Sequence, residues 1–333
     1  MTPATGEVAG AGLVGSRPTG TIDGGEPRMS PDTGPTAAAP DPERGPAARQ
    51  RPEDLLAALS LPTRGTAYSL SVPRYTGMPL FGAHPPFQVS MSRTPNGLRG
   101  DGVQPWGPRN EVNLGYMAEV VSGTSHSGAH VDALAHMTIG EDDHWYGGSN
   151  AREHLGDRGP KVGDGSKLPP FITRGVLLDV PAHRGIEALP AHEPVSADEL
   201  RAVAERQGVE VRPGDVVLIR SGYLSQWPDP DGLARHVTAG PDISAARWLL
   251  ERGVVATGSD TETFEVQPAP DPGTPANPQP VHTLLLIENG IYLFESLYLE
   301  EIARERVHEF LFIALPLKIE GTTGSMLDPL AVV

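Results

Sequence analysis

The stretch HSGAHVDALAHM, residues 126–137, is the part of the sequence whose residue types and spacing could do chemistry. It places three of the eleven histidines and one aspartate within eleven residues: His126, His130, Asp132 and His136. Burying imidazoles and a carboxylate in so alanine-rich a segment is unfavourable unless something pairs with them. A divalent ion would offset that cost, and nitrogen and oxygen ligands of this kind suit zinc or manganese, with a position left open for water or substrate.

No single regular element brings these four residues together. On one helix His126 and His130 share a face, but Asp132 falls about 120° away from His126. On a straight strand, His126 and Asp132 would lie about 20 Å apart. We therefore predict a bend centred on Gly128, which can adopt backbone angles closed to other residues, followed by a helical turn from Asp132 to His136.

The stretch resembles the His-x-Gly-Thr-His-x-Asp-x-Pro-x-His signature of the cyclase family, which includes bacterial kynurenine formamidase and isatin hydrolase. All four polar positions match, while Ala129 replaces the usual threonine and Leu134 replaces the usual proline. These departures leave the substrate and the number of ions open. The resemblance implies three metal ligands followed by a catalytic acid or base: His126, His130, Asp132 and then His136.

The resemblance extends from about Tyr68 to the C-terminus. MPLFGAHPPF is similar to the family's N-terminal substrate loop, and Phe81 stands where the formamidases have a substrate-stacking tryptophan, which implies a substrate contact. VHTLLLIENGIYLFESL is similar to the family's C-terminal metal segment. It implies His282 and Glu295 as further ligands, joined to the first set through Asp132 when two ions are present.

The hypothesis that follows is metal-assisted hydrolysis of an amide, lactam or lactone. The ion lowers the pKa of its water towards about 7, and the resulting hydroxide attacks the carbonyl. An imidazole is suited to moving the proton to the leaving group, the task assigned to His136. Two alternatives remain: a metal-dependent cyclase or dehydratase in secondary metabolism, and a non-catalytic metal-binding protein. A serine hydrolase is excluded because the sequence has no Gly-x-Ser-x-Gly elbow.

The composition limits the partners and the location of the protein. Cysteine is absent, so the chain has no thiolate ligands, disulfides or cysteine nucleophiles. A net charge of −16 argues against binding to nucleic acid. With no run of about eighteen apolar residues and no signal peptide, we expect a soluble, cytoplasmic protein that does not bind membranes. The resemblance implies a homodimer or homotetramer that acts on a small molecule.

The first fifty residues contain almost no large apolar side chains and show no helical or strand period. We predict a disordered leader at residues 1–52 and one domain at 53–333. GAGLVG, residues 10–15, matches the dinucleotide-binding pattern but lacks the flanking strand and helix that this motif needs. Residues 142–144, Asp-Asp-His, could form an accessory metal site, although a solvated loop fits them better.

The elements that must position the site alternate between strand and helix. We predict a helix at 53–60, an extended segment at 68–73, a strand at 116–121 before the motif, and then the following order: strand 175–180, helix 196–208, strand 215–221, helix 243–253, strand 254–259, helix 281–289, strand 290–295, helix 297–305 and a closing strand 309–317. Ser196 and Glu199 form a capping box, Gly208 ends that helix, and Ser244 and Gly253 bracket the next. Such alternation favours an α/β domain. The resemblance specifies the family's swivelling β/β/α-type fold in a single domain.

Overall fold

A mixed nine-stranded sheet organises the part of the chain that the structure describes. The computed structural model describes residues 41–103, 106, 110–268 and 277–333. From one edge to the other, the strands are β1 (Ala67–Ser69), β17 (Leu330–Val332), β15 (Glu309–Ala314), β9 (Phe171–Asp179), β11 (Val216–Arg220), β13 (Ala256–Ser259), β14 (Tyr292–Glu295), β4 (His130–Asp132) and β16 (Gly324–Met326). The central strands β9, β11, β13 and β14 run parallel, and every strand beyond them pairs antiparallel with its neighbour.

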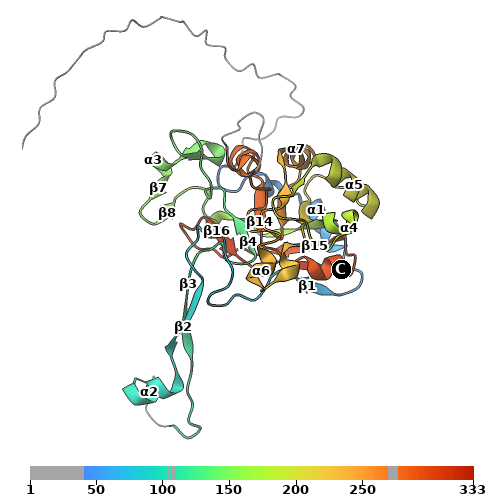
Figure 1. Cartoon of the computed structure of the whole chain (residues 1–333). Helices are drawn as coiled ribbons and strands as arrows, with labels where there is room; N and C mark the ends of the chain where they lie inside the picture. The colour runs from blue at the N-terminus through green and yellow to red at the C-terminus, as the bar shows by residue number, and fades with distance from the viewer. Residues whose placement is uncertain (1–40, 104–105, 107–109, 269–276) are drawn as a thin grey trace, which may run out of the picture. The chain divides into compact units, whose positions relative to one another are not determined.

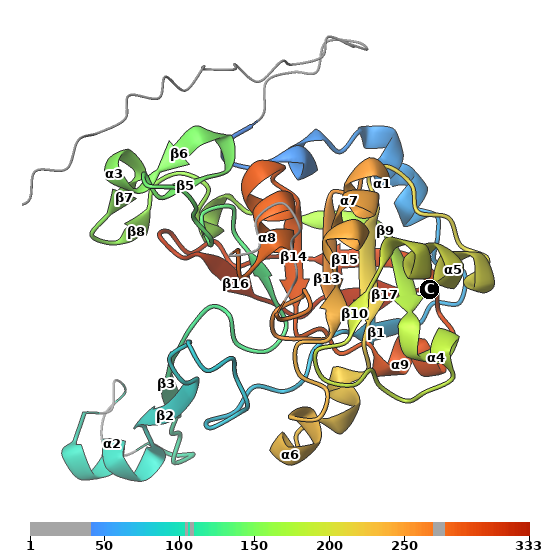
Figure 2. The same cartoon turned by 45° about the horizontal axis from the view of Figure 1, so that its top comes forward.

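Helices cover the central strands, which confirms the predicted mixed α/β architecture. All five residues of β11 are buried, as expected for a parallel strand covered on both faces. Helices α5 (Ala197–Gln207), α7 (Ile243–Glu251) and α8 (Pro280–His282) lie in a row along the sheet (Figures 1 and 2), and α8 continues into the π-helix η5 (Thr283–Glu288). The described residues from 41 to 333 form one compact unit.

The ends of α5 and α7 test the predicted capping residues. The Ser196 hydroxyl accepts a hydrogen bond from the Glu199 amide at 3.3 Å, and Gly208 ends α5 with φ +68°. The reciprocal half of the capping box is absent, because the Glu199 carboxylate binds Arg184 instead, at 2.6 Å. The prediction that Ser244 caps α7 was wrong: Asp242 is the N-cap, and its Oδ1 accepts hydrogen bonds from the amides of the two residues that follow Ile243.

The C-terminal part of the sheet differs from the prediction in one respect. Strand β15 was expected to close the fold, but the three-residue strands β16 and β17 follow it. Such short segments show no periodicity in the sequence, and they form because neighbouring strands supply their hydrogen bonds. The correction bears on the site, since β16 pairs with β4, the strand that carries part of the histidine motif.

The predicted leader lies mostly outside the described residues. Residues 1–40, which include GAGLVG, are among those not described, and the boundary at residue 52 stays a prediction. Residues 41–51 contain the 3₁₀ helix η1 (Pro46–Arg49), and the Gln50 amide donates to the Ile172 carbonyl at 2.6 Å. Helix α1 (Pro52–Leu59), which was predicted, packs on β9 and β15.

A hairpin extends away from the sheet in both views (Figures 1 and 2). It consists of β2 (Gln88–Arg93) and β3 (Ala118–Ser122), joined through α2 (Pro95–Asp101), and β3 confirms the strand expected before the motif. Every residue of β2 is exposed. We call the hairpin and α2 the arm.

The remaining short elements connect these parts. They are the strands β5 (His144–Trp145), β6 (Ser149–Asn150), β7 (Leu155–Gly156), β8 (Gly159–Pro160), β10 (Pro194–Val195) and β12 (Gly240–Pro241), and the helices η2 (Tyr146–Gly148), α3 (Ala151–His154), η3 (Gly165–Lys167), α4 (Val180–Arg184), η4 (Tyr223–Gln226), α6 (Pro230–Leu233) and α9 (Glu300–Arg304). Among the described residues, no helix has both the length and the apolar character needed to cross a bilayer.

Candidate metal centre

Three neighbouring segments bring the predicted site residues together. Strand β4 carries His130 and Asp132, and its antiparallel register with β14 places Glu295 directly opposite His130. His282 ends the short helix α8, and His126 lies in the loop just before β4. All five of these side chains are buried.

The bend predicted at Gly128 is present, and it places His126 beside His130 and Asp132. Gly128 has φ +59°, in the left-handed region that favours glycine, and the rings of His126 and His130 lie 4.9 Å apart between centroids. The predicted helical turn starting at Asp132 was wrong, because Asp132 is the last residue of β4. A tight turn follows instead, in which the His136 amide donates to the Ala133 carbonyl at 2.9 Å.

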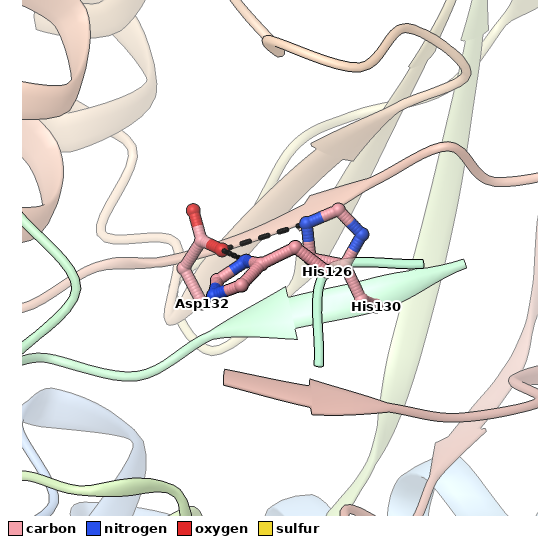
Figure 3. Close-up of side chains that lie close together, drawn as sticks. All are labelled: His126, His130 and Asp132. Atoms are coloured by element: carbon pink, nitrogen blue, oxygen red, sulfur yellow. Dashed lines mark ion pairs between the residues drawn. The ribbon is translucent and has the colours of Figure 1, made fainter. Parts of the chain in front are cut away.

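The first group of side chains that could hold an ion is His126, His130 and Asp132. Figure 3 shows both rings facing the same carboxylate oxygen, Asp132 Oδ1. It lies 3.0 Å from His126 Nδ1 and 3.6 Å from His130 Nε2. The two histidines approach from the loop and the strand, so their ligand atoms converge on one point beside the end of β4.

The second group is Asp132, His282 and Glu295, and it shares the aspartate with the first. His282 Nε2 lies 3.8 Å from Asp132 Oδ2 and 3.3 Å from Glu295 Oε1. Because the two oxygens of Asp132 face different groups, one carboxylate could bridge two ions.

In each of the three candidate histidine ligands, the ring nitrogen that faces away from the ligand group contacts a polar partner, which orients the ring. His126 Nε2 lies 3.0 Å from the Thr323 hydroxyl, His130 Nδ1 donates to the Gly128 carbonyl at 2.8 Å, and His282 Nδ1 lies 2.5 Å from Glu265 Oε1. Such partners fix which nitrogen carries the lone pair and orient it for a metal ion. The nitrogens that face the candidate centre are therefore His126 Nδ1, His130 Nε2 and His282 Nε2.

The ligand atoms lack other partners, which is the fit expected of a metal site. Among the described residues, six buried side-chain atoms have no hydrogen bond of acceptable geometry, and five lie here: His126 Nδ1, His130 Nε2, both oxygens of Asp132 and Glu295 Oε1. The short His126 Nδ1 to Asp132 Oδ1 distance therefore does not amount to a good hydrogen bond. Each buried atom left unsatisfied costs about 1–3 kcal/mol, and two divalent ions, one in each group, would satisfy all five.

Burial brings carboxylates and imidazoles close together in the centre, and this shifts their pKa values. Burial lowers the pKa of His126 to about 4, so this ring is neutral near pH 7. Burial alone would raise the pKa of Asp132, but the neighbouring histidines, His136 first, lower it overall. Burial would likewise lower the pKa of His282, yet Glu265 and Glu295 raise it to about 10. In the absence of metal, a protonated His282 thus offsets part of the carboxylate charge.

His136 and Phe81, the remaining predicted residues, lie beside the centre with a third side chain that sequence reasoning missed. The half-buried ring of His136 stacks on His126 with centroids 4.1 Å apart, and His84 stacks on the same ring at 5.0 Å. Phe81 meets His84 edge to face at 6.0 Å. His84 lies in the segment that resembles the substrate loop, but a single histidine in a loop gave no signal of its own.

A cavity opens onto the first group of ligands. It encloses about 380 Å³ when the open mouth is counted, but only about 10 Å³ of this is free to the centre of a water molecule, and its walls include His126, His130, His84 and Phe81. An ion held by the first group would therefore be within reach of water that enters through the mouth. Larger hollows lie elsewhere on the described surface, such as one beside α1 and β9, but they contain none of the ligand side chains.

Residues 142–144 do not form a second centre. Asp142 and His144 contact each other at 2.7 Å, with Asp142 exposed, and no third ligand of the described residues joins them. The expectation of a solvated loop is therefore the better description.

Two further residues that sequence reasoning missed shape the centre. Glu265, which is fully buried, also accepts hydrogen bonds from the amides of Val281 and His282, both at 2.9 Å. Gly324 on β16 leaves room for His126, because a Cβ at this position would lie 2.7 Å from the His126 ring. Neither residue lies near the motif in sequence, so no spacing pattern could have indicated it.

Replacing Glu265 with glutamine should weaken the second group. The amide of glutamine cannot accept the bonds that both carboxylate oxygens now receive, so His282 should lose its fixed orientation. Loss of such a supporting contact typically lowers metal affinity about 10–100-fold, which competition with a fluorescent chelator would measure. Glu300→Gln is the control, since it removes a half-buried carboxylate contact with Arg220 outside the centre. Equal metal affinity in Glu265→Gln and the native protein would contradict this role.

Comparison with known families matches residues 68–266 to the model named Cyclase, described as “Putative cyclase”. The match includes the whole histidine motif and ends before His282 and Glu295. Comparison with curated proteins gave no match.

Solved structures with a similar fold include a protein described as a novel cyclase, which is 27% identical, with 87% of this chain and 96% of that chain covered and a TM-score of 0.74. Isatin hydrolase A from Ralstonia solanacearum is 23% identical, with 80% and 92% covered and a TM-score of 0.58. Isatin hydrolase A from Labrenzia aggregata, bound to benzyl benzoate, is 20% identical, with 80% and 93% covered and a TM-score of 0.57. These similarities confirm the predicted fold class.

Proposed function

This chain belongs to the Cyclase family, and from that premise we propose that it is a metal-dependent hydrolase that cleaves an amide, lactam or lactone with activated water. The proposal names His126, His130 and Asp132 as ligands of one ion, and Asp132, His282 and Glu295 as ligands of a second. Zinc or manganese is the expected metal, because the donors are imidazole nitrogens and carboxylate oxygens and the chain has no cysteine.

One observation carries the proposal: two sets of buried ligand side chains share Asp132, most of their ligand atoms lack hydrogen bonds, and two histidines of the first set line a cavity. A purely structural ion is usually enclosed by a saturated ligand set, whereas a catalytic ion keeps an open position. Because His126 and His130 both line the cavity, the first position is the accessible one. This accessibility favours an enzyme over a non-catalytic metal-binding protein.

The chain's own residues divide the work of hydrolysis. A bound divalent ion activates water and polarises a carbonyl at neutral pH. Thr323, Gly128 and Glu265 hold the three histidines in the orientation that presents their free nitrogens to the centre. His136, stacked on His126 and only half-buried, is the side chain that we assign to carry the proton to the leaving nitrogen or oxygen. Phe81, at the cavity wall, is assigned to contact the substrate ring.

The test begins with metal content, measured by mass spectrometry after the purified protein has been loaded with zinc or manganese. The loaded protein is then assayed with N-formyl arylamines, cyclic imides and lactones. We expect one or two ions per chain and hydrolysis of at least one of these classes, lost on chelation and restored by the metal. Ring closure or loss of water in place of hydrolysis would favour the cyclase or dehydratase alternative. Bound metal without any turnover would favour a non-catalytic role.

We also propose that the protein is a homodimer or homotetramer, as the family resemblance implies, and the exposed arm supports this. An isolated two-stranded hairpin is at best marginally stable in water. Side chains alternate along a strand, so Val89, Met91 and Val121 share one face of the hairpin, and all three are exposed. A second copy of the chain would cover this apolar face.

A double substitution in the arm tests this association. Val89→Lys with Val121→Lys places two charges on the apolar face, and we expect the molar mass measured by light scattering to fall to that of the monomer. Leu155→Lys is the control, because Leu155 on β7 is 54% exposed, similar to Val121 at 52%. A native protein that is already monomeric, or a double variant that keeps the native mass, would contradict the proposed contact.

A further inference from the structure

Glu262 is a carboxylate in the wall of the cavity that belongs to neither group of candidate ligands. It is half-buried, so it is shielded from bulk water but reachable from the cavity. The wall that it shares with His126 and His130 is otherwise largely apolar and includes Leu224 and Trp227. An acidic group in such a position faces the space where a small molecule would bind.

The parallel sheet holds Glu262 in place. Glu262 follows β13, and Tyr223 follows the neighbouring strand β11, so both lie beyond the carboxyl ends of paired parallel strands. In open α/β sheets this edge is where ligands bind. Asp260 fixes both turns by accepting hydrogen bonds from the Ser221 amide at 2.8 Å and from the Gly222 amide at 2.7 Å.

Tyr223 and Glu262 contact each other, but no cationic side chain of the described residues is paired with Glu262. The Tyr223 hydroxyl donates to the Glu262 carboxylate, and Tyr223 is buried. No lysine, arginine or histidine of the described residues forms an ion pair with Glu262, whereas the buried carboxylates Glu265 and Glu295 each pair with a histidine. Burial raises the pKa of Glu262, and the hydrogen bond from Tyr223 offsets this in part. This carboxylate can therefore still accept a hydrogen bond from a positively charged donor.

We propose that Glu262 is a specificity-determining residue that binds a protonated amine on the substrate, while the substrate's apolar part lies against Leu224 and Trp227. This inference rests on the proposed function in one respect only, that the cavity is the substrate site. A carboxylate without a basic partner recognises an ammonium group by charge and by a directed hydrogen bond. It also disfavours substrates that carry a carboxylate at the same position.

The test uses the full chain loaded with zinc and compares two probes of similar size, benzylamine, which is protonated at pH 7, and benzyl alcohol, which is neutral. Calorimetry should show that the native protein binds benzylamine about tenfold more tightly than benzyl alcohol, because charge-assisted hydrogen bonds exceed neutral ones in strength. Glu262→Gln keeps the size of the side chain and its contact with Tyr223. We expect this variant to bind the two probes within about twofold of each other.

Two controls separate the local carboxylate from other effects. Glu301→Gln removes one half-buried negative charge outside the cavity and should keep the native preference for benzylamine. Tyr223→Phe removes the hydroxyl but keeps the charge, so it should also keep the preference. Equal binding of both probes by the native protein would overturn the proposal. A preference that survives in Glu262→Gln would do so too, since it would mean that benzylamine binds elsewhere, for example through its nitrogen to the ion.

Probe binding does not require turnover, so this test is separate from the test of the hydrolase proposal. Should the protein hydrolyse none of the substrate classes, a preference for benzylamine that depends on Glu262 would still support the recognition site. Should it hydrolyse formyl arylamines, kcat/KM for one that carries an aminomethyl group should fall about tenfold in Glu262→Gln. The corresponding value for the methyl analogue should stay unchanged, and an equal fall for both would contradict recognition of charge.

Discussion

Replacing Asp132 with asparagine is expected to abolish metal binding at both positions and, with it, hydrolysis. Asp132 is fully buried, and its two oxygens face different groups of ligand atoms. Asparagine has nearly the same size but offers one weaker oxygen and an amide group in place of the second. Because loss of a supporting contact alone lowers metal affinity about 10–100-fold, loss of the shared ligand should exceed that range. Metal content by mass spectrometry after loading is the measurement.

Asp142→Asn provides the matched control for this substitution. Asp142 also lies beside a histidine, His144, at 2.7 Å, but it is exposed and belongs to no group of three ligands. This variant should bind as much metal as the native protein. Thermal unfolding of the metal-free proteins would show whether Asp132→Asn still folds, which separates a lost ligand from a lost fold. A folded Asp132→Asn protein that kept the native metal content would refute the assignment of the centre.

Replacing His136 with alanine should lower kcat while leaving metal content unchanged. His136 stacks on His126 but is not a member of either ligand group, so its loss removes a proton carrier and no ligand. General acid and base catalysis contributes about 10²–10⁴-fold to a rate, and we expect kcat to fall within that range. Added imidazole should restore part of the lost activity, a result that a purely structural role would not give.

His84 is the comparison for His136. Its ring also stacks on His126, it lies beside His136, and it lines the cavity. Burial, together with its histidine neighbours, lowers the pKa of His84. Less of this ring is therefore protonated near neutral pH, so it is less often able to donate a proton. His84→Ala should therefore retain most of kcat, with its effect mainly on KM. An active His136→Ala protein together with an inactive His84→Ala protein would transfer the proposed role to His84.

The sequence alone predicted the part of the candidate centre whose members lie within eleven residues. The spacing of His126, His130 and Asp132 is incompatible with a straight element, and the bend at Gly128 follows from the backbone freedom of glycine. The same holds for the α/β alternation, because continuous apolar runs and helical periodicity are local patterns. His282 and Glu295 became candidates only through resemblance to a family, since one helical histidine and one glutamate at a strand end are individually ordinary.

The tertiary structure alone decided what surrounds those residues. The antiparallel register of β4 with β14 sets Glu295 opposite His130, and β16, too short to show any period, brings Thr323 and Gly324 to His126. The sequence also did not show which of two nearby polar residues caps a helix, since Asp242 rather than Ser244 caps α7. Glu265 and Glu262 are set in place by contacts with segments distant in the sequence. Local patterns determine elements, but the partners of a buried polar atom depend on which elements meet, and this is decided only when the chain packs.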